Sequence, residues 1–408
     1  MKTSYPKDKI NILLLEGVHP SVKKIFKQKG YTNLTYLKSS LPEDELIKQI
    51  KNVHLVGIRS KTQITNTVIE KANKLLAVGA FCIGTNQIDL AAAGKKGIAV
   101  FNSPFSNTRS VAELVIAEIV FLMRRIPERS SAALKGEWLK DASSSFEIRG
   151  KKLGIIGYGH IGSQVSVLAE SLGMQIYYYD IESKLPHGNA VTCSSLDDLL
   201  KISDVVSLHV PSTPQTKWMI KEKQLKQMKK GAVILNLSRG NVVEIEALKK
   251  QLQSGRLLGA GVDVFPKEPG SKSEKFISDL QDVKNVILTP HIGGSTVEAQ
   301  ANIGRDATHK LINYLETGSS SGSHSIPPLS LPVRYDAHRL LHIHKNVPGV
   351  LSEINTVLSK LKVNILGQYL KTNESIGYVV LDIDKKGSSK VLKDLKKVKH
   401  TIRVRELY

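Results

Sequence analysis

The chain has 408 residues, of which 41% are hydrophobic and 23% charged, a composition that fits two or three globular domains. No apolar run is long enough to cross a bilayer, and two cysteines give neither a disulfide framework nor a metal cluster, so no metal site is expected. The chain begins with a polar, lysine-bearing segment unlike a signal peptide, so we expect a cytoplasmic location and no membrane partner. The net charge of +21 fits either anionic ligands or lysines spread over solvated surfaces. No nucleic-acid-binding motif accompanies it, and no nucleic-acid partner is expected.

Short apolar runs alternate with amphipathic helical patterns from about residue 10 to residue 315. This alternation predicts doubly wound α/β units, in which helices cover both faces of a parallel sheet. A long helix is predicted to begin near Thr108, where Ser110 and Glu113 have capping-box spacing. A second alternating series starts at Lys152, so two α/β units are expected in tandem. A helix over 295–315 can return the chain to the first unit.

The segment 317–331 is rich in Gly, Ser, His and Pro, which predicts a linker that is flexible first and stiffer later. Beyond it the pattern changes to β-α-β-β-α-β, the ferredoxin-like arrangement. This module is too small for an elaborate active site, and its edge strands and open sheet face suit pairing with a copy of itself. Its predicted elements span 339–343, 349–362, 363–370, 378–383, 388–397 and 401–405.

A glycine-rich sequence, Gly157-Tyr158-Gly159-His160-Ile161-Gly162, stands between a predicted strand and a helical pattern. Gly157 permits a tight turn, Gly159 lets the backbone approach a pyrophosphate, and Gly162 allows the helix and strand to pack closely. The next strand ends at Asp180, whose carboxylate can accept hydrogen bonds from ribose hydroxyls and would repel a 2′-phosphate. The sequence therefore predicts an NAD site; a glycine-rich turn without a ligand is the alternative.

Three later strands lead to side chains that suit the oxidation of an alcohol: Arg239, Glu268 and His291. Because ligands bind beyond the carboxyl ends of the strands in such sheets, these side chains are expected to converge. A histidine can remove the hydroxyl proton, a carboxylate orients the ring and raises its pKa, and an arginine grips a carboxylate. Taken singly, each residue can instead be a strand-end cap, a solvated acid or a surface ion pair.

The segments 157–162, 237–240, 263–269 and 289–294 resemble the signatures of the D-isomer-specific 2-hydroxyacid dehydrogenase family. The resemblance implies that Arg239 binds substrate, His291 is the acid/base and Glu268 is its partner. It also implies NAD as the cofactor. The NAD contacts that it implies, added to Gly157, Gly159 and Gly162, are His160, Ile161, Asp180, Leu237, Ser238, Arg239, Asp263, His291, Ile292, Gly293 and Gly294.

The segments 57–62, 81–89 and 101–113 resemble the bacterial branch of this family that oxidises 3-phospho-D-glycerate. This resemblance implies the reaction of 3-phospho-D-glycerate with NAD to give 3-phosphooxypyruvate and NADH, the first step of L-serine biosynthesis. Reduction of 2-oxoglutarate to 2-hydroxyglutarate is an expected side activity, since its distal carboxylate resembles the phosphate in charge and reach. The expected substrate-binding residues are Arg59, Ser60, Lys61, Asn107, Arg109 and Lys140.

The C-terminal module resembles an ACT domain, and its first loop, 344–351, resembles the effector loop of serine-inhibited members. His344, Asn346 and Asn364 are the expected effector-binding residues, with L-serine as the allosteric effector; the asparagines can also merely cap the loop. Related enzymes carry a Gly-Gly hinge where this chain has 333–338, without glycine, which is expected to weaken the coupling of serine binding to catalysis. The resemblance further implies a homotetramer.

The expected fold is α/β: a Rossmann-type NAD domain inserted in a flavodoxin-like substrate domain, followed by a ferredoxin-like ACT domain. Two other functions stay open, an NAD-responsive binding or sensor protein on a dehydrogenase fold and a dehydrogenase for another D-2-hydroxy acid. The intact set of Arg239, Glu268 and His291 argues against the sensor. The predicted domains are 1–107 with 296–330 for the substrate, 108–295 for NAD, and 338–408 for regulation.

Overall fold

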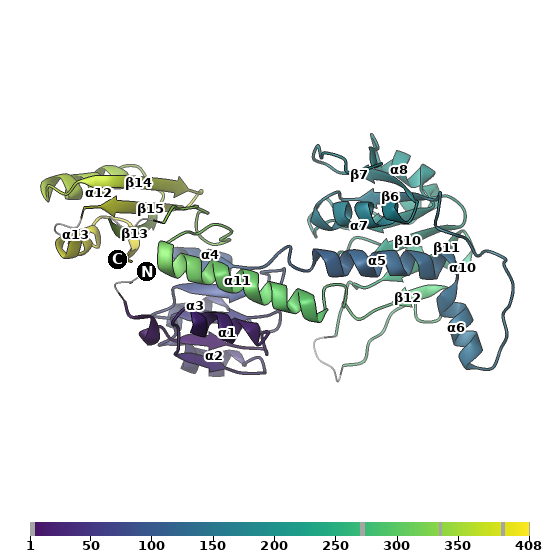
Figure 1. Ribbon diagram of the computed structural model, residues 1–408, viewed down its shortest axis with the longest axis horizontal. Helices are drawn as coiled ribbons and strands as arrows, with labels where there is room; N and C mark the ends of the chain where they lie inside the picture. Colours follow the sequence, from purple (N-terminus) through teal and green to yellow (C-terminus); the bar gives the residue numbers. More distant parts are fainter. Residues whose placement is uncertain (1–4, 270–273, 334–336, 385–387, 408) are drawn as a thin grey trace. The chain divides into compact units, whose positions relative to one another are not determined.

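The computed structural model describes residues 5–269, 274–333, 337–384 and 388–407. The chain forms two compact units, one made of Met1–Ser106 with Gln300–Tyr408 and the other of Asn107–Ala299 (Figure 1). The first unit holds both the predicted substrate domain and the predicted regulatory domain; the boundaries between the three domains stay predictions. No helix among the described residues is both long and apolar enough to span a membrane.

The first unit begins with a five-stranded parallel sheet in the order β2-β1-β3-β4-β5. This is the flavodoxin-like strand order, and it confirms the predicted doubly wound sheet. The strands are short, and β1, β3, β4 and β5 are buried throughout, as expected for a sheet covered on both faces. The elements are the 3₁₀ helix η1 (Lys7–Lys9), β1 (Ile12–Leu14), α1 (Ser21–Gln28), β2 (Leu34–Tyr36), α2 (Glu43–Ile50), β3 (Leu55–Ile58), α3 (Asn66–Lys71), β4 (Ala77–Ala80), α4 (Leu90–Lys95), β5 (Ala99–Phe101) and α11 (Val297–Thr317).

The regulatory module is a four-stranded antiparallel sheet in the order β14-β15-β13-β16. Its β-α-β-β-α-β order confirms the predicted ferredoxin-like fold. Helices α12 and α13 pack with Leu340, Val379 and Leu381 in a core of their own on one face of the sheet. The elements are β13 (His338–Lys345), α12 (Val350–Lys360), β14 (Ile365–Thr372), β15 (Ile376–Ile383), α13 (Ser388–Leu395) and β16 (Thr401–Glu406).

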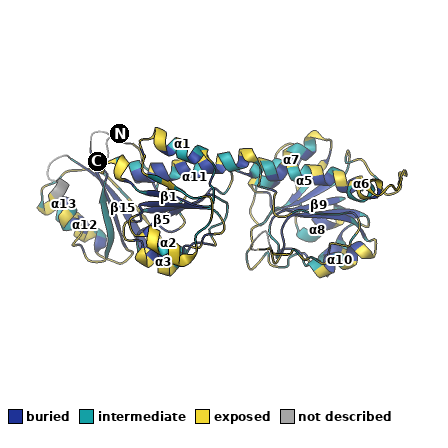
Figure 2. Ribbon diagram, turned by 90° about the horizontal axis from the view of Figure 1, so that it is seen from below, coloured by how far each residue is buried: buried dark blue, intermediate teal, exposed yellow. Residues whose placement is uncertain are grey.

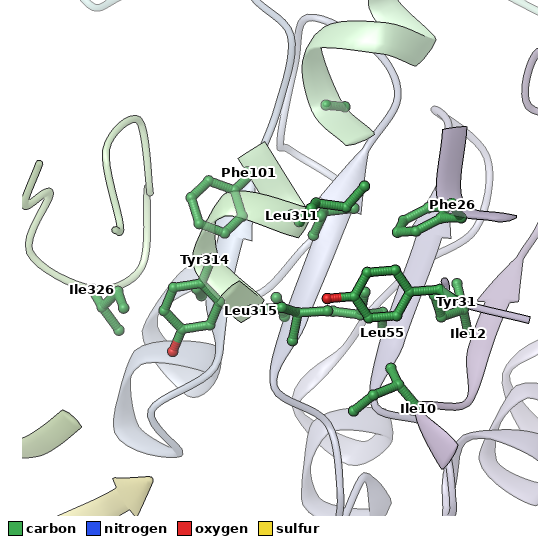
Figure 3. Close-up of a cluster of buried hydrophobic side chains, with 14 of the residues drawn as sticks. Ile10, Ile12, Phe26, Tyr31, Leu55, Phe101, Leu311, Tyr314, Leu315 and Ile326 are labelled. Carbon is green, nitrogen blue, oxygen red and sulfur yellow. The ribbon is translucent and has the colours of Figure 1, made fainter. Parts of the chain in front are cut away.

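The other face of this sheet is not open, so the sequence prediction of an open sheet face was wrong. Leu341, Ile343 and Tyr378 from this face share one hydrophobic core with Phe101 of β5 and Leu315 of α11. Below, the parallel sheet with its helices, α11 included, is called the first half of the unit. Figure 3 shows the part of this core in which the side chains of α11 meet those of the parallel sheet. The face is covered because it carries large apolar side chains that the neighbouring sheet and α11 can bury.

Polar contacts tie the module to the end of α11. Arg339 donates from Nε and Nη2 to the two carboxylate oxygens of Asp382, at 2.7 Å each, and from Nη1 to the carbonyl of Thr317 at 3.0 Å. Both charged side chains are 0% exposed. The Tyr378 hydroxyl donates to the carbonyl of Gly318. The module therefore docks through satisfied buried hydrogen bonds as well as through apolar surface.

The segment predicted to be a flexible linker is packed and hydrogen-bonded, which corrects that prediction. Ser320 is buried and donates its hydroxyl hydrogen to the carbonyl of Pro327, while Ser325 donates to the carbonyl of Ile98. Ser323 forms an antiparallel bridge with Phe101 of β5. Composition misled here because serine hydroxyls can satisfy the backbone carbonyl groups of a buried irregular segment.

The second unit is built on a seven-stranded parallel sheet in the order β12-β11-β10-β9-β6-β7-β8. Strands lie inside it and the outward faces of its helices are exposed (Figure 2). The strand order reverses at β6, which has β7 on one side and β9 on the other. The elements are α5 (Thr108–Met123), α6 (Ile126–Leu134), β6 (Lys152–Ile156), α7 (His160–Ser171), β7 (Gln175–Tyr179), β8 (Val191–Thr192), α8 (Leu196–Ile202), β9 (Val205–Leu208), α9 (Glu222–Gln227), β10 (Ala232–Asn236), α10 (Ile245–Gln253), β11 (Leu257–Val262) and β12 (Val286–Leu288).

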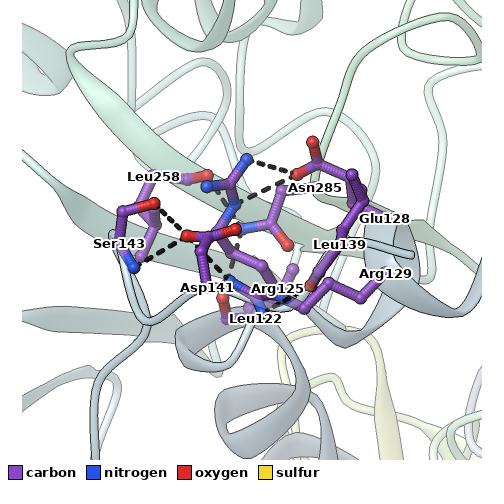
Figure 4. A network of polar contacts seen from close by, with 9 residues as sticks. All are labelled: Leu122, Arg125, Glu128, Arg129, Leu139, Asp141, Ser143, Leu258 and Asn285. Carbon is purple, nitrogen blue, oxygen red and sulfur yellow. Dashed lines mark hydrogen bonds and ion pairs between the residues drawn. The ribbon is translucent and has the colours of Figure 1, made fainter. Parts of the chain in front are cut away.

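Helix α5 begins at the predicted place, but the predicted capping box is absent. The N-cap is Asn107, without a side-chain cap, and the Ser110 hydroxyl lies 2.8 Å from the Thr296 hydroxyl. At the other end of α5, Arg125 adopts a left-handed conformation (φ 53°) and holds the Glu128 carboxylate through Nε and Nη2 (Figure 4). That turn directs the chain from α5 into α6.

Candidate active site

The glycine-rich turn has the geometry of a dinucleotide site. Gly157 has a φ of +90°, and a Cβ there would lie 2.5 Å from the carbonyl oxygen of His209. A Cβ on Gly162 would lie 2.1 Å from the carbonyl oxygen of Gly157, so the helix can approach β6 this closely only with glycine. A Cβ on Gly159 would meet nothing within 4 Å. The amino end of α7 is therefore open to a pyrophosphate, and it lies at the point where the strand order reverses.

Asp180 holds the turn from the end of β7. One of its carboxylate oxygens accepts a hydrogen bond from the backbone N–H of Tyr158 at 2.7 Å, and the other accepts one from that of Glu182 at 3.0 Å. Each oxygen keeps a lone pair for a ribose hydroxyl. The buried ring of Tyr158 stacks on Tyr178 of β7 with a centroid separation of 4.0 Å, which ties the turn to that strand. These residues fit NAD.

Strands β10, β11 and β12 are neighbours in the sheet, so their carboxyl ends meet at one edge. Asp263, directly after β11, joins two of them. Its Oδ1 accepts from the Thr289 hydroxyl at 2.6 Å and from the N–H of Ile292 at 2.7 Å, and its Oδ2 accepts from the N–H of Gly293 at 2.8 Å. This buried carboxylate therefore fixes the loop that carries His291.

His291 and Glu268 form the pair that the sequence predicted, with 2.9 Å between Nδ1 and Oε2. The other oxygen of Glu268 accepts from the N–H of Phe265 at 3.1 Å, which orients the carboxylate. The hydrogen bond to Glu268, opposed by partial burial, raises the pKa of His291, and the charge of Asp263 adds to the rise. The side chain of His291 is 54% exposed, so its other ring nitrogen can meet a substrate.

His291 has a φ of 55°, in the left-handed region. A side chain with a Cβ is strained there, and such strain is usually found where the surrounding structure holds a functional residue in place. Here Asp263 and Glu268 supply that hold, one on the backbone after His291 and one on its ring.

Arg239 lies after β10, at the same edge. Its Nη1 donates to the carbonyl of Ser238 at 2.7 Å, and its own carbonyl accepts from the amide of Asn236 at 3.0 Å. Its charge lowers the pKa of both Glu268 and His291, although burial and the Glu268–His291 hydrogen bond act more strongly. The guanidinium is half-buried and close enough to this pair for its charge to reach a substrate held there. Leu237 and Ser238, the other predicted NAD contacts of this strand end, are buried.

The predicted substrate residues divide between the two units. In the first, Arg59, Ser60 and Lys61 follow β3, and a glutamate that sequence reasoning missed shapes their loop. The carboxylate of Glu16 accepts from the N–H groups of Arg59, Lys61 and Thr62 at 3.1, 3.0 and 2.8 Å. The backbone is thus pinned, while the Ser60 and Lys61 side chains are exposed.

In the second unit, Arg109 and Lys140 are exposed, and Asn107 is not. Arg109 pairs through Nε with Glu113 at 2.6 Å. Arg129 donates to the carbonyl of Leu139, which anchors the backbone beside Lys140 (Figure 4). Asn107 is buried against the loop after His291, and a Cβ on Gly294 would lie 2.2 Å from its side-chain nitrogen. That contact gives Asn107 a structural task at the base of the loop.

The predicted effector residues differ in exposure. Asn346 is exposed and donates to the carbonyl of Asn373 at 2.7 Å, and Asn364 is exposed just before β14, at the edge of the sheet. His344 is buried, with Nδ1 bonded to the carbonyl of Lys345 at 2.8 Å, and burial lowers its pKa. Of residues 333–338, the glycine-free segment from which weaker coupling was predicted, 334–336 lie outside the described residues.

Two further polar residues of the second unit were missed by sequence reasoning. His209 directly follows β9; its Nε2 lies 2.9 Å from the Ser207 hydroxyl, and burial lowers its pKa to about 3. It could have been found by applying the strand-end argument to β9. Glu118, in α5, is 2% exposed, and neither carboxylate oxygen has a partner among the described residues. Burial, with a contribution from Asp263, raises the pKa of Glu118 to about 8. A mid-helix glutamate gives no sequence signal for this.

Fold and site together define an NAD-dependent oxidoreductase of the α/β class. Residues 116–293 match the NAD-binding domain of the D-isomer-specific 2-hydroxyacid dehydrogenases, and residues 340–403 match an ACT domain of the acetohydroxyacid synthase small-subunit type. Among solved structures, D-2-hydroxyisocaproate dehydrogenase is similar, with a TM-score of 0.70, 27% identity, and coverage of 78% of this chain and 100% of that one. So is the D-lactate dehydrogenase of Aquifex aeolicus, complexed with NAD and lactic acid, with a TM-score of 0.63, 30% identity, and coverage of 74% and 95%.

Comparison with curated relatives places the chain in a narrower group within this class of oxidoreductases. The D-3-phosphoglycerate dehydrogenase of Haemophilus influenzae is 53% identical, over 100% of this chain and 99% of that protein. The enzyme of the same name from Escherichia coli K12 is also 53% identical, over the whole of both chains. The chain therefore belongs to the D-isomer-specific 2-hydroxyacid dehydrogenase family, in the branch formed by the D-3-phosphoglycerate dehydrogenases.

Proposed function

We propose that the chain oxidises 3-phospho-D-glycerate to 3-phosphooxypyruvate with NAD, as the first step of L-serine biosynthesis. The observation that carries the proposal is the His291–Glu268 pair on the sheet edge that bears the dinucleotide turn, in a chain 53% identical over its full length to D-3-phosphoglycerate dehydrogenases. The alternative of a sensor without turnover is disfavoured because such a protein has no need to keep an oriented acid/base pair.

In the proposed reaction, His291 removes the proton of the C2 hydroxyl through Nε2, because Nδ1 is engaged by Glu268. Glu268 holds the ring and stabilises the imidazolium that forms. Arg239 binds the substrate carboxylate and polarises the oxygen that becomes the carbonyl. NAD, when bound, supplies the acceptor for the hydride that leaves C2. One proton and one hydride thus leave the substrate, and a ketone remains.

The selectivity for a phosphorylated acid is proposed to reside in Arg59, Ser60 and Lys61, which the Glu16 carboxylate presents on a pinned loop. Arg109 and Lys140 are proposed as further cations for the substrate, and Lys140 is exposed on an anchored segment. Reduction of 2-oxoglutarate stays a prediction, as does a cytoplasmic location.

The ACT domain supports regulation by an amino acid, and we propose L-serine as the inhibitor. Asn346 and Asn364 are the side chains proposed to bind it, because both are exposed, one on the first loop of the module and one before its edge strand. The buried His344 is proposed to position that loop through its bond to the carbonyl of Lys345. A homotetramer is proposed from the sequence resemblance.

The test is NADH formation from 3-phosphoglycerate, with D-lactate, D-glycerate and NADP as controls and L-serine as a titrant. Turnover confined to the phosphorylated acid and NAD, and suppressed by serine, supports the proposal. Turnover with an unphosphorylated acid alone would move the chain to another substrate of the family. Absence of turnover with every acid, in both directions, would favour the sensor.

A further inference from the structure

A cavity of about 370 Å³ lies inside the first unit, where the regulatory module meets the parallel sheet. Its walls come from the amino-terminal segment, the end of α11, helix α13 and the end of β16. The volume is that of a site for a small organic molecule. None of the residues predicted to bind NAD, substrate or effector lines it.

Arg405, at the end of β16, supplies a cation to the cavity lining. No carboxylate of the described chain pairs with it, and its Nη1 is buried without a hydrogen-bond partner. The guanidinium lies 5.2 Å from the centroid of the Tyr314 ring, a contact that holds the group but leaves its donors free. A guanidinium in such surroundings favours an anion that can accept its hydrogen bonds.

The charge of Arg405 acts on several groups around the cavity. It lowers the pKa of the Tyr31 hydroxyl, against the stronger effects of burial and of the Glu316 carboxylate, and it adds to the lowering of the His54 pKa that burial dominates. Lys74 lowers the pKa of His54 as well. Beside His54 both of these charges are positive, which favours an anionic group on that side of the cavity.

His54 adds a neutral donor. Its Nδ1 accepts a hydrogen bond from the backbone N–H of Asn11 at 3.0 Å, so the proton of the neutral ring sits on Nε2. The remaining charged groups are already engaged. Lys7 pairs with Glu316, and an oxygen of the Glu406 carboxylate lies 3.9 Å from Nδ1 of His338. Arg405 and His54 are thus the donors left for a ligand.

The rest of the lining is apolar or aromatic. Leu76 and Leu315 line it from the first half of the unit, and Leu392 and Leu407 from the regulatory module. Ile10, Tyr31 and Leu315, which belong to this lining, are labelled in Figure 3. A ligand that satisfies both kinds of wall has one anionic group and a compact apolar body.

We propose that this cavity binds a small monocarboxylic acid with a branched aliphatic side chain. The carboxylate accepts hydrogen bonds from Arg405 and His54, and the side chain packs among the leucines of both halves. Because such a ligand contacts the parallel-sheet half and the regulatory module together, it stabilises their docking. The site is separate from catalysis, and its occupancy is independent of which hydroxy acid the chain oxidises.

The probe is 4-methylpentanoate, which lacks the 2-hydroxy and 2-oxo groups that the oxidation needs, with 4-methylpentanamide as its uncharged control. Binding to the full-length chain is measured by isothermal titration calorimetry. Arg405→Met keeps the apolar stem and removes the charge, and it is expected to weaken binding by about tenfold or more. Leu392→Phe fills the cavity from α13 and is expected to weaken binding without changing the charge. Lys393→Gln, exposed on the same helix, is the matched control and leaves affinity unchanged.

Binding of the acid but not the amide, lost in both cavity variants and kept in the presence of NAD, 3-phosphoglycerate and L-serine, supports the site. The proposal is overturned by no binding at millimolar 4-methylpentanoate, by equal binding of acid and amide, by affinity that Leu392→Phe leaves unchanged, or by displacement with NAD or 3-phosphoglycerate. Should Arg405→Met fail to fold, the comparison of Leu392→Phe with Lys393→Gln decides the outcome.

Discussion

The second unit has a basic–acidic pair, His291 and Glu268, at the edge of its sheet, and the regulatory module of the first unit has another, Arg339 and Asp382. The two pairs differ in how far they are exposed. At the catalytic edge, His291 and Glu268 are half exposed and meet each other through one hydrogen bond. In the module, Arg339 and Asp382 are fully buried and meet through two, with a third donated to the chain. The first pair is free to change its protonation and meet a substrate. The second is inaccessible to solvent and stabilises the docking of the module, since a buried charge is tolerated only when it is fully paired.

The largest expected effect comes from replacing His291, the proposed base. His291→Asn is expected to lower kcat by about 10²–10⁴-fold, because the proton acceptor is lost. Asparagine tolerates the left-handed backbone of this position, so the loop is expected to keep its form. Steady-state rates measure the first effect and thermal unfolding the second. A variant that keeps most of its kcat would contradict the assigned role.

Changes to the buried Arg339–Asp382 pair are expected to lower the free energy of unfolding and to leave the catalytic rate unchanged. Arg339→Met leaves Asp382 buried without its partner and is expected to cost on the order of 3–5 kcal/mol in the free energy of unfolding. The double variant Arg339→Met/Asp382→Leu removes the stranded charge and is expected to recover most of that loss. Denaturant titration of the single and double variants measures both. Equal losses in the two would show that the stranded charge is not the cause.

Glu118 is a buried acid of the second unit. Unlike Asp382, it is not paired with an arginine among the described residues, and its raised pKa favours the protonated, uncharged form. With a pKa of about 8 in the folded chain and 4.5 as the reference value, the folded state keeps a proton that the unfolded state releases between these values. Stability contributed by this site therefore falls as pH rises from about 4.5 to 8 and is constant above. Glu118→Gln is expected to remove this fall, a gain on the order of 3 kcal/mol at pH 8 relative to pH 5. Unfolding of both chains at several pH values measures it; parallel curves would refute it.

The smallest expected effect is a displacement of the pH profile. Glu268 raises the pKa of His291, and oxidation needs the unprotonated ring. Glu268→Gln removes the charge, so the acidic limb of kcat/KM is expected to move to lower pH while the optimum rate falls. The profile of NADH formation against pH is the measurement, with Glu244→Gln, remote in sequence from this loop, as a control. A limb that stays in place would assign it to another group.

Much of the dinucleotide site could be predicted from the sequence because the residues that form it are neighbours in the chain. A tight turn, a close backbone approach and a helix start all fall within Gly157 to Gly162, and the geometry matches each of them. Arg239, Glu268 and His291 were found because parallel strands bring their carboxyl ends together in any doubly wound sheet. The same argument, applied to β9, would have added His209.

The contacts of other residues could not be predicted from the sequence because their partners are distant in the chain. Glu16 binds a loop more than forty residues away, as the separations of its bonds show. Asn107 was expected to meet substrate, and no local pattern indicated that it is also buried against the loop of Gly294. The serine-rich segment was expected to be flexible, but Ser320 and Ser325 use their hydroxyls inside the fold.

By itself, the sequence determined the succession of elements, the NAD-binding turn and which polar residues follow the strands, Arg239, Glu268 and His291 among them, because periodicity and strand ends are properties of neighbouring residues. Only the tertiary structure decided what covers the regulatory sheet, that burial raises the pKa of Glu118, and where the cavity beside Arg405 lies. These depend on which side chains burial brings together, and the free energy of a buried charge is set by partners that no local pattern names.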